Sequence, residues 1–128
     1  MAMFEEKIIY GKRITTNNNH LEDIQKLWGE VLSLHLEGEL FAVYHNYESD
    51  FTGNYDLLVG TEQPNRTADS VHIPSSTYHI VEVDHTDELG VFHTWQAIWQ
   101  SDLTRAYTID FEHYRADGTI AIYLSMSE

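Results

Sequence analysis

The sequence contains no cysteine and only two prolines in 128 residues. The lack of cysteine excludes disulfide bonds, thiolate nucleophiles and cysteine-based zinc sites, and it is compatible with a reducing compartment. The longest apolar stretches, such as residues 41–44, fall far short of the ~18 residues that span a bilayer. No cationic leader with an apolar run opens the chain, so no signal peptide is predicted. We therefore expect a cytoplasmic protein whose fold depends on its hydrophobic core.

Basic residues are scarce as well. Seven Lys and Arg residues stand against 21 Asp and Glu residues, which gives a formal net charge of −14 with histidine neutral. Nucleic acids and anionic membranes both attract a basic face, so we expect neither as a partner. An acidic surface favours solubility and attracts cationic partners. The charge taken alone is also compatible with an acidic surface that has no function.

The apolar periodicity predicts strands and helices in a repeating order. β-branched and aromatic residues indicate a strand over 4–15. Apolar residues at three- and four-residue spacing predict amphipathic helices over 20–34 and 89–101, the first capped by Asn18 or Asn19. Alternation and turn residues predict further strands over 40–47, 55–60, 76–83, 107–114 and 119–126.

This order is βαββ twice, with an apolar-poor connection over 62–70. We predict an α+β fold in which residues 1–128 form one domain, with halves at about 4–60 and 71–126. Each half is an antiparallel sheet covered by one helix, and a ligand groove lies at the pseudo-two-fold axis. The helices are expected on the faces away from the groove.

The strand over 107–114 holds the most informative set of side chains. Alternation places Asp110, Glu112 and Tyr114 on one face, and Phe111 and His113 on the other. A partly buried carboxylate among aromatic rings is what a pocket for flat organic cations needs. The predicted ligand-binding residues are Glu112, Tyr78, Trp95, Trp99, Tyr114 and Tyr123. A solvated Glu112 and tryptophans that serve only as core residues remain the alternative.

Catalytic and cofactor motifs are scarce. The eight histidines show no metal-site spacing, and the acidic loop over 84–88 is typical of a solvated turn before a helix. There is no Gly-x-Ser-x-Gly elbow and no glycine-rich phosphate loop. We predict no metal and no cofactor, so any catalysis would use general acid–base groups, with Glu112 and Tyr114 as candidates.

Five motifs resemble the GyrI-like small-molecule-binding domains, also called AraC-type or bacterial transcription-activator effector-binding domains. In order, they are YDLLVGTE at 55–62, IPSSTY at 73–78, WQAIW at 95–99, DFEHY at 110–114 and IAIYL at 120–124. The resemblance implies two βαββ halves around a groove for lipophilic, often cationic compounds. It also implies that the acid of the penultimate strand is Glu112 and that Tyr78, Trp95 and Tyr123 form aromatic walls.

Many relatives carry a helix-turn-helix before this domain, whereas this chain opens on its first strand, so we expect a stand-alone form. Ser75-Ser76 stands where Ala-Gly is more usual in the family, and the last strand lacks a common proline. Three functions compete: an effector-binding protein for transcription regulation or drug sequestration, a hydrolase that opens strained cyclopropane-type toxins with Glu112 as acid or base, and an acidic protein-interaction module such as a gyrase inhibitor.

Overall fold

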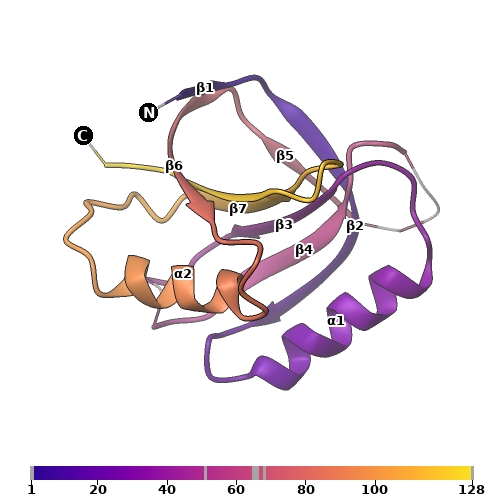
Figure 1. Ribbon diagram of the computed structural model, residues 1–128, viewed down its shortest axis with the longest axis horizontal. Coiled ribbons are helices and arrows are strands. Elements are labelled where there is room, and N and C mark those ends of the chain that lie inside the picture. The colour runs from indigo at the N-terminus through magenta and orange to yellow at the C-terminus, as the bar shows by residue number, and fades with distance from the viewer. Residues whose placement is uncertain (1, 51, 65–66, 68, 128) are drawn as a thin grey trace.

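The computed structural model describes residues 2–50, 52–64, 67 and 69–127, which form one eight-stranded sheet and two helices (Figure 1). The elements are β1 (Ala2–Phe4), β2 (Lys7–Thr16), α1 (Leu21–Ser33), β3 (Leu40–His45), β4 (Tyr55–Thr61), β5 (Asp69–Ile73), β6 (Ser76–Val83), α2 (Gly90–Trp99), β7 (Ile109–Tyr114) and β8 (Ile120–Leu124). The predicted α+β class is therefore correct.

The sheet joins the two βαββ units edge to edge. Its strand order is β1-β6-β8-β7-β3-β4-β2-β5, and every neighbouring pair is antiparallel. The units β2-α1-β3-β4 and β6-α2-β7-β8 meet at the central β3–β7 pair, where Ala42 lies opposite Glu112. The short strand before each unit pairs with the other unit, since β1 extends β6 and β5 extends β2. Each unit therefore completes the edge of its partner.

Two predictions about the strands differ from the structure. The strand expected over 4–15 is divided, because residues 5 and 6 separate β1 from β2. The connection expected over 62–70 contains the start of β5, although residues 65, 66 and 68 lie outside the described residues. β5 was missed because its five residues alternate too briefly between apolar and polar types to indicate a strand.

One face of the sheet supports a buried aromatic core. Phe111 stacks on Tyr123 with ring centroids 4.6 Å apart, and Phe4 lies 4.8 Å from Phe111. Phe41 and Val43 of β3 join the same cluster and are fully buried. Burying a side chain of this size contributes about 2 kcal/mol. This face therefore supplies much of the stability of the fold.

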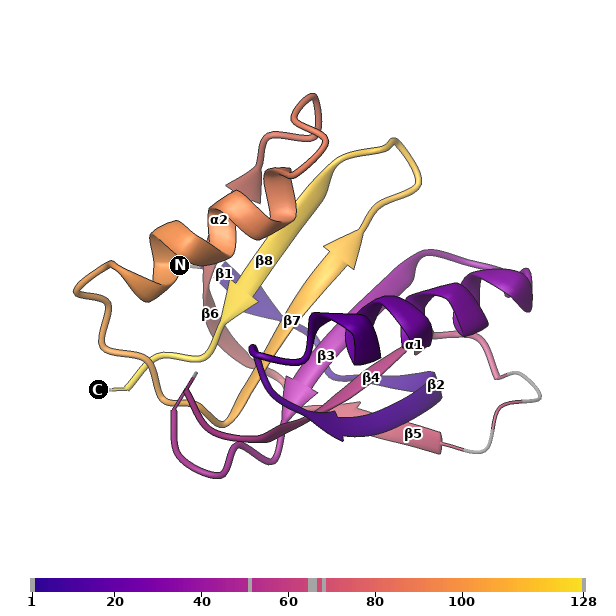
Figure 2. The ribbon, with the colours of Figure 1, turned by 90° about the horizontal axis from the view of Figure 1, so that it is seen from below.

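Both helices lie on the opposite face, on either side of the central strands (Figure 2). α1 packs Leu27 and Val31 against β3 and β4, and α2 packs Ile98 against β6 and β8. The expectation that the helices face away from the groove is wrong. Their apolar stripes are wider than the sheet can cover, so part of each stripe is turned toward the other helix across a hollow.

The start of α1 also differs from the prediction. His20 occupies the N-cap position and makes no side-chain capping hydrogen bond. Asn18, a predicted cap, instead accepts a hydrogen bond from the Tyr55 hydroxyl at 2.7 Å. Among the described residues, neither helix has the length and apolar content that a membrane crossing requires.

Two glycines face each other across β2 and β4 and set how closely these strands approach. Gly11 pairs with Gly60, and a Cβ atom added at Gly60 would lie 1.9 Å from the backbone oxygen of Tyr10. By contrast, Gly29 on an exposed face of α1 has no neighbouring atom within 4 Å of an added Cβ.

We expect Gly60→Ala to lower the free energy of unfolding by about 2 kcal/mol, because the strands must move apart. The matched variant Gly29→Ala should raise it by about 0.5 to 1 kcal/mol, since alanine favours a helix interior. Urea unfolding followed by circular dichroism measures both changes. A Gly60→Ala protein as stable as the wild type would contradict the close approach of β2 and β4.

Candidate ligand-binding site

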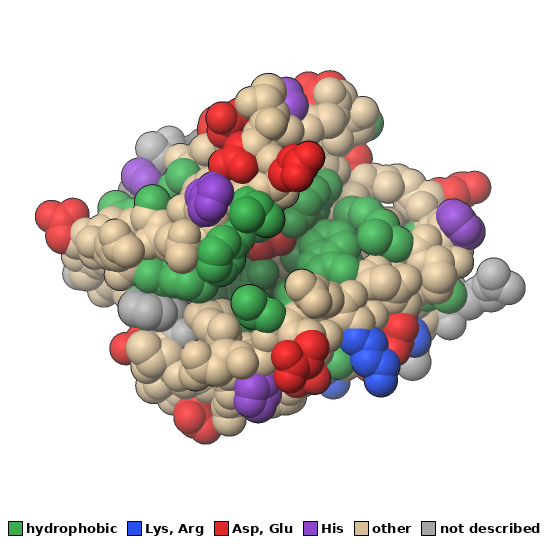
Figure 3. Space-filling view, turned by 60° about the horizontal axis from the view of Figure 1, so that its bottom comes forward, with side chains coloured by type: hydrophobic (Ala, Val, Ile, Leu, Met, Phe, Trp, Pro, Cys, Tyr) green, Lys and Arg blue, Asp and Glu red, His purple; other side chains and the backbone are tan. Residues whose placement is uncertain are grey.

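A cavity of about 610 Å³ lies between α1 and α2 over the central strands. Figure 3 shows it as a hollow lined by hydrophobic side chains, with acidic side chains around its rim. Its volume falls within the ~300–1,000 Å³ of cavities that bind drug-sized molecules. The aromatic residues that line it are Trp28, Tyr44, Tyr47, Tyr55, Phe92, Trp95, Trp99 and Tyr114.

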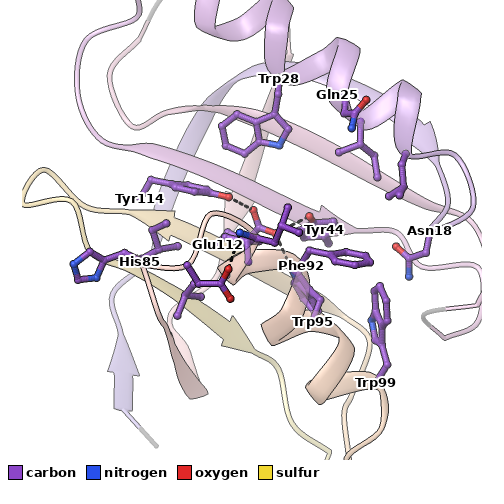
Figure 4. A pocket seen from close by; sticks show the side chains of 18 of the residues that line it. Asn18, Gln25, Trp28, Tyr44, His85, Phe92, Trp95, Trp99, Glu112 and Tyr114 are labelled. Atoms are coloured by element: carbon purple, nitrogen blue, oxygen red, sulfur yellow. Dashed lines mark hydrogen bonds between the residues drawn. The ribbon is translucent and has the colours of Figure 1, made fainter.

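Glu112 lies in this cavity and is held by three neutral donors (Figure 4). Its Oε2 accepts hydrogen bonds from the Tyr44 hydroxyl at 2.8 Å and from Trp95 Nε1 at 2.7 Å. Its Oε1 accepts one from the Tyr114 hydroxyl at 2.6 Å. The residue is only 2% exposed. The donors stabilise the carboxylate without neutralising its charge.

The local sequence explains how these groups meet. Strand alternation turns Glu112 and Tyr114 of β7 to the same face, as predicted, and this is the face that the helices cover. The β3–β7 register then sets the small Ala42 opposite Glu112, with Tyr44 two residues further along β3 on the same face. A larger residue at position 42 would fill the space beside the carboxylate. Trp95 reaches the carboxylate from the inner side of α2.

Burial dominates the electrostatics of the site. Loss of hydration raises the pKa of Glu112 above its ordinary value, although its three hydrogen bonds act in the opposite direction. Burial, followed by the nearby charge of Glu112, raises the pKa of Tyr44 and of Tyr114. Both phenols therefore remain protonated donors. The anion that they hold attracts a cation more strongly than a hydrated carboxylate would.

Aromatic rings enclose the carboxylate from both units. Trp28 of α1 meets Tyr114 edge-to-face, with centroids 5.0 Å apart, and Tyr44 meets Trp95 at 5.3 Å in the same way. Trp99 lies 6.4 Å from Trp95 and continues this wall along α2. Such pairs hold the rings in place and leave π faces available to a ligand.

Acidic residues of the loop before α2 form part of the rim, together with His85. Asp84 accepts hydrogen bonds from the backbone and hydroxyl of Thr86, and Asp87 pairs with His93 at 2.7 Å. The loop is therefore a hydrogen-bonded turn. In the part of the chain that the structure describes, no three His, Asp or Glu side chains come together as a metal ion requires.

The structure brings together only part of the predicted site. Glu112, Trp95, Trp99 and Tyr114 all line the cavity. Tyr78 and Tyr123 do not, and their expected grouping with Glu112 is corrected.

The cause is strand alternation. Tyr123 follows Ile122, the residue that pairs with Glu112, so it points to the opposite face and packs in the aromatic core. Tyr78 lies in that same core, and its hydroxyl donates to the carbonyl oxygen of Pro74 at 3.1 Å.

Sequence reasoning missed the contribution of the first unit. Tyr44, Tyr47 and Tyr55 line the cavity, as does Trp28. A signal was present, because the sequence around Trp28 echoes the sequence around Trp99 in the second unit. Equivalent residues of two pseudo-symmetric units face the axis between them. Trp28 and Trp99 accordingly both line the cavity between the units. Arg105, from the link between α2 and β7, was also missed.

The fold and this cavity together define a class of protein, in which two βαββ units of an α+β fold enclose a hollow of ligand size. The chain belongs to the family of integron-associated effector binding proteins, whose family model, Cass2, matches residues 5–126.

Known proteins share this fold. The integron cassette protein VCH_CASS2, from the mobile metagenome of Vibrio cholerae, superposes with a TM-score of 0.83 at 24% identity and covers 98% of this chain and 94% of that one. SAV2435, solved bound to tetraphenylphosphonium, has a TM-score of 0.71 at 14% identity and covers 98% and 92%. YobU of Bacillus subtilis (strain 168), provisionally named a transcriptional regulator, is 28% identical over 109 residues, 74% of this chain and 68% of that protein. The effector-binding fold that the five motifs predicted is thus confirmed.

We expect Glu112→Gln to raise the free energy of unfolding at about pH 8 by about 1 kcal/mol, because the amide keeps the shape but removes a buried charge. Since the pKa of Glu112 is raised on folding, the wild-type carboxyl favours the folded state at low pH and loses this advantage as pH rises through its folded pKa. The advantage of the glutamine variant should therefore shrink toward about pH 4. Urea titrations at several pH values measure it.

Exposed Glu82 provides the control, because the guanidinium of Arg115 lowers its pKa. The wild-type Glu82 therefore gains stability relative to Glu82→Gln as pH rises, which is the opposite sign. If the stability difference between the glutamine variant and the wild type changed with pH in the same direction at both positions, the burial effect at Glu112 would be contradicted.

Proposed function

We propose that this protein binds a lipophilic aromatic cation as its effector, with Glu112 as the counter-charge. The observation that supports this most directly is a carboxylate, 2% exposed, in an aromatic cavity where all three of its donors are neutral. A buried charge that lacks an opposite charge is costly. A cation that enters the cavity removes this cost, and neutral ligands do not.

The surroundings favour the same ligand class. Aromatic faces attract a desolvated cation with up to ~2 kcal/mol beyond the area they bury. The net charge of −14 and the acidic rim concentrate cations near the entrance. The structural relative SAV2435 was solved with tetraphenylphosphonium, an aromatic monocation, and this supports extending the ligand class to the present chain.

A regulatory role is the biological setting that we propose. The family is described by effector binding, and the relative YobU is named provisionally as a transcriptional regulator. Occupation of the cavity would bring α1 and α2 into contact with one ligand, which links ligand binding to the arrangement of both units. Sequestration of toxic cations in the cytoplasm would use the same site.

Tetraphenylphosphonium and tetraphenylborate test the proposal, because they match in shape and carry opposite charges. We expect calorimetry to detect binding of the phosphonium and at least tenfold weaker binding of the borate. Glu112→Gln should weaken phosphonium binding by about 10- to 100-fold, since the shape remains and the charge is lost. Equal affinity for the two ions would refute the role of Glu112 as counter-charge.

His113→Gln is the matched control, one position along β7. His113 points to the opposite face, where it stacks on Phe41 at 4.3 Å and pairs with Glu39 at 3.0 Å. Phosphonium affinity should be unchanged in this variant. A larger loss in His113→Gln than in Glu112→Gln would mean that the ligand binds on the other face of the sheet.

The two alternative functions predict different results. A general base needs a carboxylate lone pair for water, and the donors Tyr44, Trp95 and Tyr114 leave Glu112 one such position, on Oε1. A hydrolase would show product by mass spectrometry, and Glu112→Gln would remove turnover while affinity remained. An acidic interaction module would lose partner binding when surface acids are reversed, with no response to Glu112→Gln.

A further inference from the structure

A second charged group lines the same cavity. Arg105 lies in the link between α2 and β7, and its side chain is only 3% exposed. Its Nη2 donates to Asp110 Oδ2 at 2.8 Å, and Asp110 is fully buried. Asp110 is therefore paired with a cation, whereas the three donors to Glu112 are neutral.

The Asp110 carboxylate accepts four hydrogen bonds and cannot accept more from the guanidinium of Arg105. Its Oδ2 also accepts from the Tyr47 hydroxyl at 2.6 Å, and its Oδ1 accepts from the backbone and hydroxyl of Ser125 at 2.8 and 3.2 Å. Arg105 Nε and Nη1 are buried and have no hydrogen-bond partner among the described residues. Buried donors without a partner are costly, and native structures rarely leave them so.

Aromatic rings surround these free donors. The guanidinium carbon lies 4.4 Å from the ring centroid of Tyr107 and 5.6 Å from that of Trp95. Rings hold the guanidinium in place but supply no strong oxygen acceptor. Tyr107 adopts a φ of 53°, an uncommon conformation for a residue other than glycine. The link is therefore held in an unusual shape beside an arginine that is not fully satisfied.

We propose that Arg105 forms a second subsite of the cavity, whose unpaired N–H groups bind an uncharged oxygen acceptor of the ligand, such as a carbonyl oxygen, when the ligand displaces the rings that cover them. This inference rests on the proposed function, because it adds a recognition point to the cation site. Glu112 then selects for positive charge, and Arg105 selects among cations for those with a suitably placed oxygen.

The balance of buried charge argues for a neutral oxygen. Arg105, Asp110 and Glu112 are all buried, so this region holds two negative charges and one positive charge. A monocation balances the three. A ligand that also carried a carboxylate would restore the excess negative charge in a place with little water, which is unfavourable.

Trp95 indicates how far apart the two ligand groups lie. Its Nε1 donates to Glu112, while its ring lies beside the Arg105 guanidinium. Both groups therefore contact the same indole. A ligand that reaches both needs its cationic centre and its oxygen separated by no more than about one aromatic ring.

A pair of rigid probes tests the subsite. (4-Acetylphenyl)trimethylammonium and (4-ethylphenyl)trimethylammonium differ by a carbonyl in place of a methylene, and each has its cation across one ring. Calorimetry with the wild-type protein should show about five- to tenfold tighter binding of the acetyl probe. Arg105→Lys keeps a positive charge for Asp110 but lacks the free guanidinium donors, so the ratio of the two affinities should fall to about one.

Two further variants support the measurement. Arg115→Lys changes an arginine that pairs with Glu82 outside the cavity, so the ratio should remain as in the wild type. If Arg105→Lys fails to fold, the double change Arg105→Met with Asp110→Asn removes both charges of this pair together, so that neither partner is left as an unpaired ion. It too should give a ratio of about one.

The outcomes separate the two proposals. Equal wild-type affinity for the two probes, or a ratio that survives in folded Arg105→Lys, overturns the Arg105 subsite while phosphonium binding still stands. Failure of tetraphenylphosphonium and both probes to bind the folded wild-type protein overturns the proposed function, and the subsite with it.

Discussion

The burial of one carboxylate governs the arrangement of this protein. Glu112 is removed from water and depends on three donors, from β3, α2 and β7. Tyr44 and Glu112 belong to different βαββ units, so their hydrogen bond forms only when the units are docked. Because an unpaired buried charge is costly, the donors stabilise the docked state. They do not neutralise the charge of Glu112.

The two faces of the sheet have different packing. On one face, rings such as Phe111 and Tyr123 stack closely and fill the space between the strands. On the other face, the helices cover the outer strands and leave a cavity of about 610 Å³ over the centre. Strand alternation lets neighbouring residues such as Phe111 and Glu112 serve these two purposes independently. The dense face can offset the stability that the open face lacks.

The two buried carboxylates of β7 differ in the charge of their partners. Asp110 and Glu112 are two residues apart on the same face of β7, yet their partners differ. Asp110 is paired with a cation, Arg105, and with hydrogen-bond donors, which makes it a structural group. Glu112 has neutral partners only, so its charge is not balanced within the protein. The difference between the two carboxylates therefore lies in the partners that the tertiary structure supplies.

Local periodicity determined the two helices, most of the strands, the α+β class and the common face of β7 on which Glu112 and Tyr114 lie. These features could be predicted because they depend on neighbours within one strand or helix. Periodicity does not say which face of a sheet another element covers, so the side of the helices and the placement of Tyr78 and Tyr123 were decided by the tertiary structure.

The partners of Glu112 show the same limit. Tyr44 lies 68 positions before Glu112 in the chain. Arg105 reaches the cavity from the link between α2 and β7, which has no regular spacing of apolar residues. Composition and pattern thus indicated one acid and several aromatic residues as candidates for a ligand site. Only the docking of the two units decided which of them meet, because contacts between distant segments depend on strand register and helix packing rather than on local spacing.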